Sequence, residues 1–472
     1  MTIKVSVILP SLNVSPYIEE CLQSVRRQTL REIEILCIDA GSTDGTREII
    51  AAHAAEDSRI RPLGSKIRSV GYQLNLGLAA AQGEYIGIVE TDDYIAPGMY
   101  ELLYAAAQAH RAEIVLNDYQ AFWGETTKSA PLEAGDHASS GRGERQFLET
   151  TKSAPLEAGD HASNGRGERQ FLETTKSAPL GAGDRASGGG GERQFLDKSV
   201  ARPAQYHRPI DPAAEQEVFD NDMSIWAGLY SRDFLLRNNI RELETPGAAY
   251  QDQGFWFQAF VCAKRLLYLQ NAAQGYRYRL DNPRSSVHSK RLTFAICEEF
   301  SFIKEQLEKR GLWEKYKATY KRLQFNRYLW NYLRLEGPEQ LQFLQRFRAE
   351  NELPVSIEEF HARRRQEKQS LQAILHGNQP VIIFGCGSDG IRLLEYLRSK
   401  DELGRITCLT DNNAALHDKT IFGLPVLAPE RAWQDYPQAY YLLASLNYGG
   451  AIRQQLLAAG VGQENLWAGH VC

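Results

Sequence analysis

Short apolar runs alternate with amphipathic stretches along the first part of the chain. Runs rich in β-branched and other hydrophobic residues predict strands at 5–9, 33–38, 60–63, 85–89 and 114–119. Between them, a helix is predicted to begin at Ser15 as its N-cap, and further helices at 46–55, 69–82 and 97–109. Strands that alternate with helices predict an α/β fold with a parallel, doubly wound sheet.

Polar side chains follow the predicted strands, in the loops 11–13, 39–44 and 90–93. In an open α/β sheet, ligands bind beyond the carboxyl ends of the strands. These loops are therefore expected at one edge of the sheet, where they would form a pocket for a nucleotide with its phosphates and a metal ion.

Three acidic residues, Glu90, Asp92 and Asp93, directly follow the apolar run 85–89. Carboxylates at a strand end suit a hard divalent cation such as Mg²⁺. A second interpretation is that Asp92 and Asp93 cap the helix expected near Pro97. The acidic residues alone leave both interpretations open.

Four segments resemble family 2 glycosyltransferases of GT-A fold in order and spacing: 10–13, 19–29, 39–46 and 90–94. The resemblance implies a nucleotide-sugar donor, with a UDP-sugar favoured, a Mn²⁺ or Mg²⁺ ion, and transfer with inversion. It implies Asp93 as the direct metal ligand, with Asp92 toward the ribose or the water shell of the metal. Many members have a second acid where this chain has Ala40, which leaves the nucleotide open. The residues assigned to donor binding are Pro10, Asn13, Glu19, Asp39, Asp44, Asp92 and Arg279.

Later segments, 225–230, 246–256 and 278–286, resemble the acceptor-side half of the same domain. The catalytic carboxylate of the family falls on Asp252, which would be the general base; a helix cap is the alternative. Arg279 is expected to contact the diphosphate, although a solvated surface arginine fits the sequence equally well.

A 24-residue unit recurs at Glu125, Glu149 and Glu173. It is rich in Gly, Ser, Glu and Arg and poor in large apolar residues, so we expect residues 125–196 to be a disordered insertion without chemistry of its own. Residues 291–378 are predicted to be a helical connector. Its stretch 312–333 interleaves aromatic and basic residues, which fits an amphipathic bundle or, as an alternative, a face resting on a membrane surface.

Residues 379–472 are predicted to form a second, Rossmann-like domain. A strand at 381–384 leads into a GxGxxG turn and a helix at 391–399, and a second strand at 406–409 follows. A nucleotide or NAD would bind there; the alternative is a structural module without a nucleotide. The residues of this second nucleotide site are Gly385, Gly387, Gly390 and Asp411.

Composition also indicates which partners and which location the protein has. The net charge of −5 gives no argument for nucleic-acid binding. Seven scattered cysteines without a CxxC pair, no signal peptide and no long apolar window predict a cytoplasmic protein, with peripheral contact to the inner face of the membrane as an option.

We expect a GT-A domain at 1–124 plus 197–290 that transfers sugar to a glycan or lipid-linked acceptor in surface polysaccharide synthesis. Two alternatives are a sugar-nucleotide oxidoreductase or epimerase and a non-catalytic sugar-nucleotide-binding protein.

Overall fold

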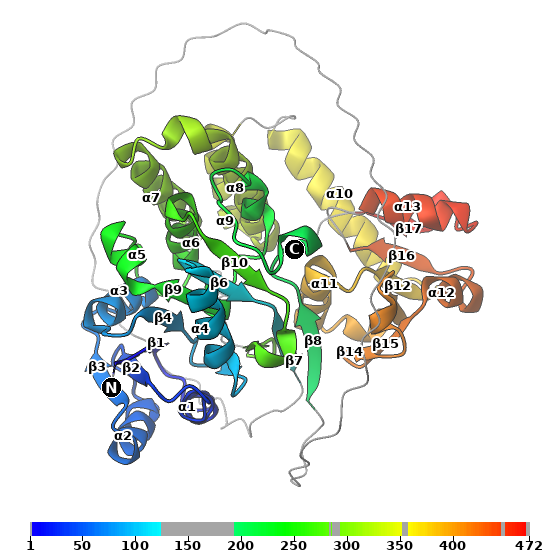
Figure 1. The fold of residues 1–472 in the computed structure, drawn as a ribbon. Helices are drawn as coiled ribbons and strands as arrows, with labels where there is room; N and C mark the ends of the chain where they lie inside the picture. Colours follow the sequence, from blue (N-terminus) through cyan, green and yellow to red (C-terminus); the bar gives the residue numbers. More distant parts are fainter. Residues whose placement is uncertain are drawn as a thin grey trace, which may run out of the picture. The chain divides into compact units, whose positions relative to one another are not determined.

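The computed structural model of the chain describes residues 2–123, 193–282, 285, 293–351, 357–444 and 449–468. Its largest sheet has seven strands in the order β10-β6-β9-β4-β1-β2-β3 (Figure 1). All five strands predicted from the first part of the chain are present in it. The strands are β1 Val5–Ser11, β2 Ile33–Asp39, β3 Ile60–Gly64, β4 Tyr85–Ile88, β6 Ile114–Asn117, β9 Gly228–Ser231 and β10 Leu266–Leu269.

One strand of this sheet runs against the others. β9 is antiparallel to both of its neighbours, β4 and β6, whereas the remaining pairs are parallel. Gly228 allows the close approach, because a Cβ atom there would lie 2.0 Å from the carbonyl oxygen of Val115. The prediction of a wholly parallel sheet is therefore wrong at β9, which enters from a distant part of the chain.

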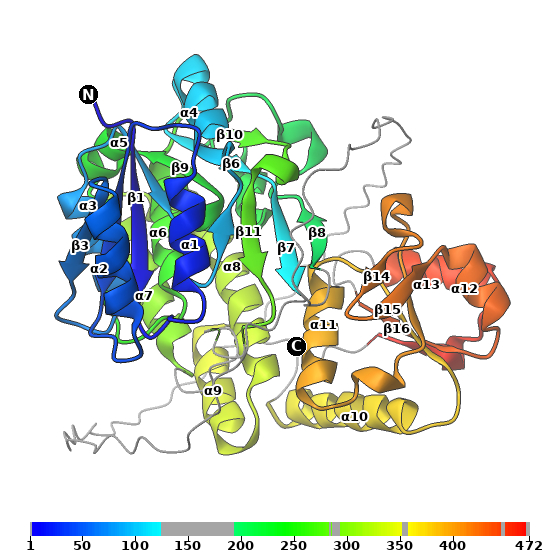
Figure 2. The same cartoon turned by 90° about the horizontal axis from the view of Figure 1, so that it is seen from below.

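Helices flank the sheet, and α1 and α2 pack against each other beside β1–β3 (Figure 2). α1 begins later than predicted: its N-cap is Tyr17, which makes no side-chain capping bond. Ser15 instead donates its backbone N–H to Asp44 Oδ2, so the predicted cap is wrong. The helices of this part are α1 Ile18–Arg26, α2 Thr46–Glu56, α3 Val70–Ala80, α4 Met99–His110, α5 Arg232–Arg237 and α6 Gln251–Cys262.

A second sheet has the order β5-β11-β7-β8. Its strands are β5 Tyr94–Ile95, β11 Tyr276–Arg279, β7 Tyr119–Trp123 and β8 Gln194–Lys198. β8 pairs antiparallel with β7, although its first residues belong to the third sequence repeat. The predicted insertion boundary at 196 is therefore wrong, and residues 125–192 of the repeats lie outside the described residues.

The predicted connector contains α7 Ala295–Lys309, α8 Trp313–Arg334, α9 Gly337–Glu350 and α10 Ile357–Leu375. The tyrosines of α8 point into the helical layer: Tyr316, Tyr320, Tyr328 and Tyr332 are at most 3% exposed. Such burial fits the amphipathic bundle. It excludes these four rings from a membrane-facing surface, because they are covered by protein.

The C-terminal sheet has the order β14-β15-β13-β12-β16-β17, and the run from β15 to β17 is parallel. The two strands and the helix predicted there are present. Its elements are β12 Val381–Phe384, α11 Ser388–Ser399, β13 Cys408–Thr410, β14 Thr420–Ile421, β15 Leu424–Leu427, α12 Pro429–Asp435, β16 Tyr440–Leu443, α13 Gly449–Ala458 and β17 Leu466–Trp467.

Two further expectations concern the chain as a whole. Among the described residues, no helix combines the length and the apolar character that crossing a bilayer requires. The six cysteines within the described ranges are all free thiols.

Candidate active site

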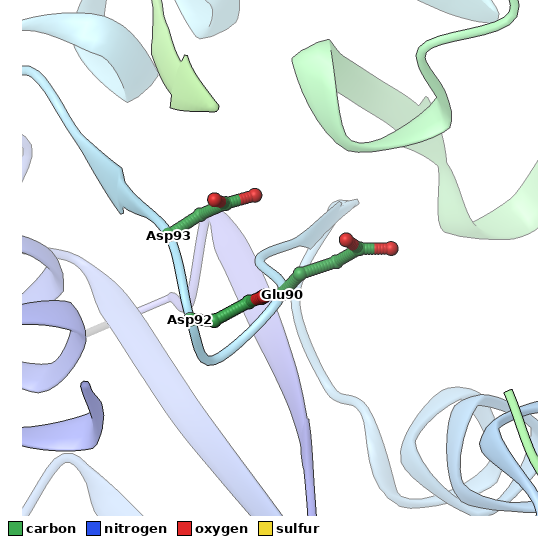
Figure 3. Close-up of side chains that lie close together, drawn as sticks. All are labelled: Glu90, Asp92 and Asp93. Carbon is green, nitrogen blue, oxygen red and sulfur yellow. The ribbon is translucent and has the colours of Figure 1, made fainter. Parts of the chain in front are cut away.

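The three acidic residues lie in the turn between β4 and β5, and their carboxylate oxygens come within 4.8 Å of one another. Figure 3 shows Glu90 and Asp93 extending to the same side of this turn. Glu90 is exposed, Asp92 half-buried and Asp93 buried. Helix α4 begins at Met99 with Gly98 as its N-cap, and no side chain caps it. The capping interpretation of Asp92 and Asp93 is therefore wrong.

The crowding of these carboxyl groups is electrostatically unfavourable in the absence of a cation. Although part of its side chain reaches solvent, Glu90 stands in a crowded group of acids, and desolvation followed by repulsion from Asp92 and Asp252 raises its pKa. Burial and the same kind of repulsion raise the pKa of Asp93 well above its ordinary value. Asp93 Oδ2 is also buried without a hydrogen-bond partner. Converging oxygen ligands, one of them unsatisfied, fit a hard divalent cation.

Arg279 holds the acidic turn in place. Its backbone N–H donates to Asp93 Oδ1 at 2.7 Å, and its Nε donates to the carbonyl oxygen of Asp92 at 2.8 Å. Its Nη2 donates to Glu20 Oε2 at 2.8 Å, and the side chain is only 2% exposed. The alternative of a solvated surface arginine is wrong. The guanidinium group supports the acidic turn, and its direct contact with a diphosphate stays a prediction.

The loops after β1 and β2 are fastened to each other by the residues predicted to bind the donor. Asn13 accepts a hydrogen bond from the Thr43 N–H, and Asp44 accepts one from the Ser15 N–H, both at 2.9 Å. Asp39 accepts from the backbone N–H groups of Gly41 and Ser42. The carbonyl oxygen of Pro10 accepts from Thr91 Oγ1, which ties β1 to the acidic turn. These contacts shape the pocket edge, and direct donor contacts stay predictions.

The prediction named Glu19, but the neighbouring Glu20 is the residue that contacts Arg279. Glu19 Oε2 lies 2.9 Å from His53 Nε2 at the contact between α1 and α2, which gives no support to the donor-binding role. Its neighbour Glu20 bonds Arg279 and also Arg193. On a helix, adjacent residues point in different directions, so the sequence could not tell which of the two faces the site.

Asp252 is the second residue of α6, and it does not cap that helix, whose N-cap is Tyr250. Burial raises the pKa of Asp252 to about 6, and the positive charge of Arg327 on α8 opposes the shift. The charge of Asp252 in turn acts on Glu90 across the site. A carboxyl group with this pKa is suited to accepting a proton near neutral pH.

Two further acids, Glu242 and Glu299, are buried near Asp252 and were not predicted from the sequence. Glu299 Oε2 accepts the Gly254 N–H at 3.2 Å, whereas neither carboxylate oxygen of Glu242 has a partner among the described residues. Burial and the charge of Asp252 raise the pKa of Glu299 to about 9. Glu299 is therefore protonated at pH 7, and burial raises the pKa of Glu242 as well.

An aromatic wall adjoins the acidic turn. The Trp226 ring stacks on that of Tyr278, with centroids 5.1 Å apart and planes 5° apart, and lies 4.3 Å from that of Tyr276. Tyr276 Oη accepts the backbone N–H of Glu90 at 2.9 Å. Aromatic surface beside a few convergent polar groups is typical of a ligand pocket. The sequence singled out both segments but gave no sign that they meet.

The glycine turn of the C-terminal sheet is closed from within. Asp411 Oδ2 accepts the Cys386 N–H at 2.6 Å, and Asp411 Oδ1 accepts the Asn413 N–H at 2.8 Å. Gly390 serves close packing, because a Cβ atom there would lie 1.9 Å from the carbonyl oxygen of Gly385; no atom lies near the corresponding point at Gly387. This arrangement gives no support to the ribose-binding role of Asp411, since its oxygens are already bonded.

Comparison with known proteins shows a similarity of the N-terminal part of the chain. The model of the family Glycosyl transferase family 2 matches residues 6–166. The N-terminal part of the chain is therefore similar to family 2 glycosyltransferases.

Curated relatives of this part of the chain have glycosyltransferase names. The uncharacterized glycosyltransferase EpsJ of Bacillus subtilis is 40% identical over 111 residues, 24% of this chain and 32% of EpsJ. Glycosyltransferase GlyG of Streptococcus pneumoniae is 38% identical over 116 residues, 24% of this chain and 38% of GlyG. The chain thus spans about a third of the length of these curated relatives. The structure of S. aureus TarS 1-349 in complex with UDP-GlcNAc has 16% identity, a TM-score of 0.46, and coverage of 84% of this chain and 88% of TarS.

Proposed function

We propose that the chain is an inverting, metal-dependent glycosyltransferase that moves a sugar from a nucleotide-sugar donor, with a UDP-sugar favoured, to a glycan or lipid-linked acceptor of a surface polysaccharide. The observation that carries the proposal is the cluster of Glu90, Asp92 and Asp93 in one turn, with Asp93 Oδ2 buried and without a hydrogen-bond partner. Direct displacement at the anomeric carbon needs such a metal site for the leaving group and a base for the acceptor, which is the role assigned to Asp252.

Asp93, with its unsatisfied Oδ2, and Asp92 would hold the cation, with Glu90 beside them. When bound, a divalent cation supplies positive charge that stabilises a departing nucleoside diphosphate. Arg279 and Asn282 keep the ligands in place, since Asn282 Nδ2 donates to Asp92 Oδ2 at 2.7 Å.

Asp252 would act on the acceptor. Its carboxylate removes the proton of the attacking hydroxyl while the hydroxyl oxygen bonds to the anomeric carbon. The bond between that carbon and the phosphate oxygen breaks in the same step, and the diphosphate leaves with the electron pair. Attack opposite to the leaving group inverts the anomeric configuration. Trp226 and Tyr278 supply the apolar surface on which a sugar ring of the acceptor can rest.

The proposal is tested with the purified full chain and a panel of nucleotide sugars, by measuring release of the nucleoside diphosphate with Mn²⁺, with Mg²⁺ and with EDTA. Hydrolysis of one donor that needs the metal and disappears in Asp93→Asn supports it. Asp233→Asn, an exposed acid on α5 paired with Arg237, is the matched control and should retain full activity. Metal-independent hydrolysis, or equal activity of Asp93→Asn, would contradict the proposal.

A further inference from the structure

Helix α6, which carries the proposed general base Asp252, begins in an unusual backbone conformation. Tyr250, the N-cap of α6, has a φ angle of 68°, in the left-handed region that non-glycine residues rarely adopt. Its carbonyl oxygen accepts the Gln253 N–H at 3.0 Å and so starts the helix around Asp252. The direction in which the Asp252 side chain leaves the helix therefore depends on the conformation of Tyr250.

Helix α8 supplies the contacts that hold Tyr250. The Tyr250 hydroxyl donates to Asn331 Oδ1 at 2.6 Å. The Tyr250 ring also lies edge-on to Trp330, with centroids 5.9 Å apart, and the Arg334 guanidinium lies 5.3 Å from its centroid. A rare conformation persists where the surroundings hold it in this way.

Asn331 is itself fixed. It is completely buried, its Nδ2 donates to the Thr293 carbonyl oxygen at 2.8 Å, and its Oδ1 also accepts from Arg334 Nε at 2.9 Å. All the hydrogen-bonding atoms of its amide are thus turned to defined partners. One turn earlier on the same face of α8 stands Arg327, whose charge acts on Asp252.

From this geometry we propose that Asn331 and Tyr250 are positioning residues of the transferase, and that helix α8 fixes the general base through their hydrogen bond. The inference rests on the proposed function, because it needs Asp252 to act as the base. It assigns part of the connector to the active site, where the sequence indicated only a joining bundle.

The test uses the full chain and the variants Tyr250→Phe and Asn331→Leu, with Tyr320→Phe as the matched control. Tyr320 is also a buried tyrosine, and Tyr320→Phe likewise removes a single hydroxyl. In the wild-type chain this hydroxyl donates to the Phe300 carbonyl oxygen at 3.0 Å. It lies on α8, and its hydroxyl contacts helix α7 instead of the start of α6. If the two Tyr→Phe variants have similar melting temperatures, a lower kcat in Tyr250→Phe alone reflects lost positioning and not a general loss of stability.

We expect Tyr250→Phe to lower kcat about 10- to 100-fold with the donor KM unchanged, because a small misplacement of a reacting group is costly. Asn331→Leu should do the same, and the double variant should be no worse than either single one. Additive losses, or a kcat of Tyr250→Phe equal to that of Tyr320→Phe, would overturn the inference while the proposed function stands. A wild-type chain that transfers no sugar would overturn the proposed function and this inference with it.

Discussion

The backbone N–H of Arg279 donates a hydrogen bond of 2.7 Å to Oδ1 of Asp93, although the two residues are 186 positions apart. This contact joins β11 to the turn after β4, and the antiparallel pairing of β11 with β5 brings it about. It leaves the second oxygen of Asp93 buried without a partner. One strand pairing thus both orients the carboxylate and leaves it one oxygen for a metal ion.

Arg279→Met should weaken Mn²⁺ binding about 10-fold, because Asp92 loses the side-chain contact that fixes its backbone and supporting shells typically contribute 10–100-fold to metal affinity. Calorimetric titration of the full chain with Mn²⁺ measures the change. Arg277→Met is the matched control, since that guanidinium donates to the carbonyl oxygens of Ala272 and Gly275 instead. Equal Mn²⁺ affinity of the two variants would show that Arg279 does not support the metal site.

Transfer should show an acidic limb near pH 6, because the base must be ionised and the pKa of Asp252 is about 6. The rate is expected to rise with pH through this value. Asp252→Asn removes the base and should lower kcat by ~10²–10⁴. The check is kcat measured from pH 5 to 8. A wild-type rate in Asp252→Asn would leave the residue with a structural role only.

Arg327→Met should shift the same limb to higher pH, since the positive charge of Arg327 lowers the pKa of Asp252. In this variant the rate at pH 6 should fall more than the maximal rate, which is reached at higher pH. Arg322→Met is the control on α8, because Arg322 pairs with Asp220 instead. An unchanged limb in Arg327→Met would contradict the electrostatic contact.

Glu299→Gln should stabilise the fold increasingly as pH rises. The folded state keeps Glu299 protonated up to about pH 9, whereas the unfolded chain ionises it near its ordinary pKa of 4.5. Its contribution to stability is therefore full below pH 4.5 and is lost as pH rises toward 9. Each pH unit in this interval costs at most about 1.4 kcal/mol. Urea unfolding of both proteins at pH 5 and pH 8 measures the difference in stability. A stability gain that does not depend on pH would contradict the burial of Glu299 in its protonated form.

Deleting residues 125–172 should leave melting temperature and turnover nearly unchanged. The deletion removes two whole sequence repeats and keeps one, together with every described residue, and loop length has only a small effect on stability. Deleting residues 125–196 should instead lower the melting temperature, because it removes three of the five residues of β8 and also Arg193, which bonds Glu20. Equal stability of the two deletion variants would show that β8 contributes nothing.

The sequence by itself determined the strands and helices of the first 120 or so residues, since each is encoded by a local pattern of apolar and polar positions. It also predicted that Glu90, Asp92 and Asp93 belong to one site, because they occupy one turn after one strand. The identity of Asp252 as a candidate base came from resemblance, and the structure supplies the partner charges that fit the role.

Only the tertiary structure decided which distant groups complete the site. The antiparallel β9, the support of Asp93 by Arg279 and the hydrogen bond between Tyr250 and Asn331 all join segments far apart in sequence. No local pattern encodes such pairings, because their energy comes from packing and hydrogen bonds that exist only after the chain has closed. The same reason explains why Glu20 and not Glu19 contacts Arg279. Packing sets the orientation of helix α1, and this orientation decides which of the two side chains faces the site.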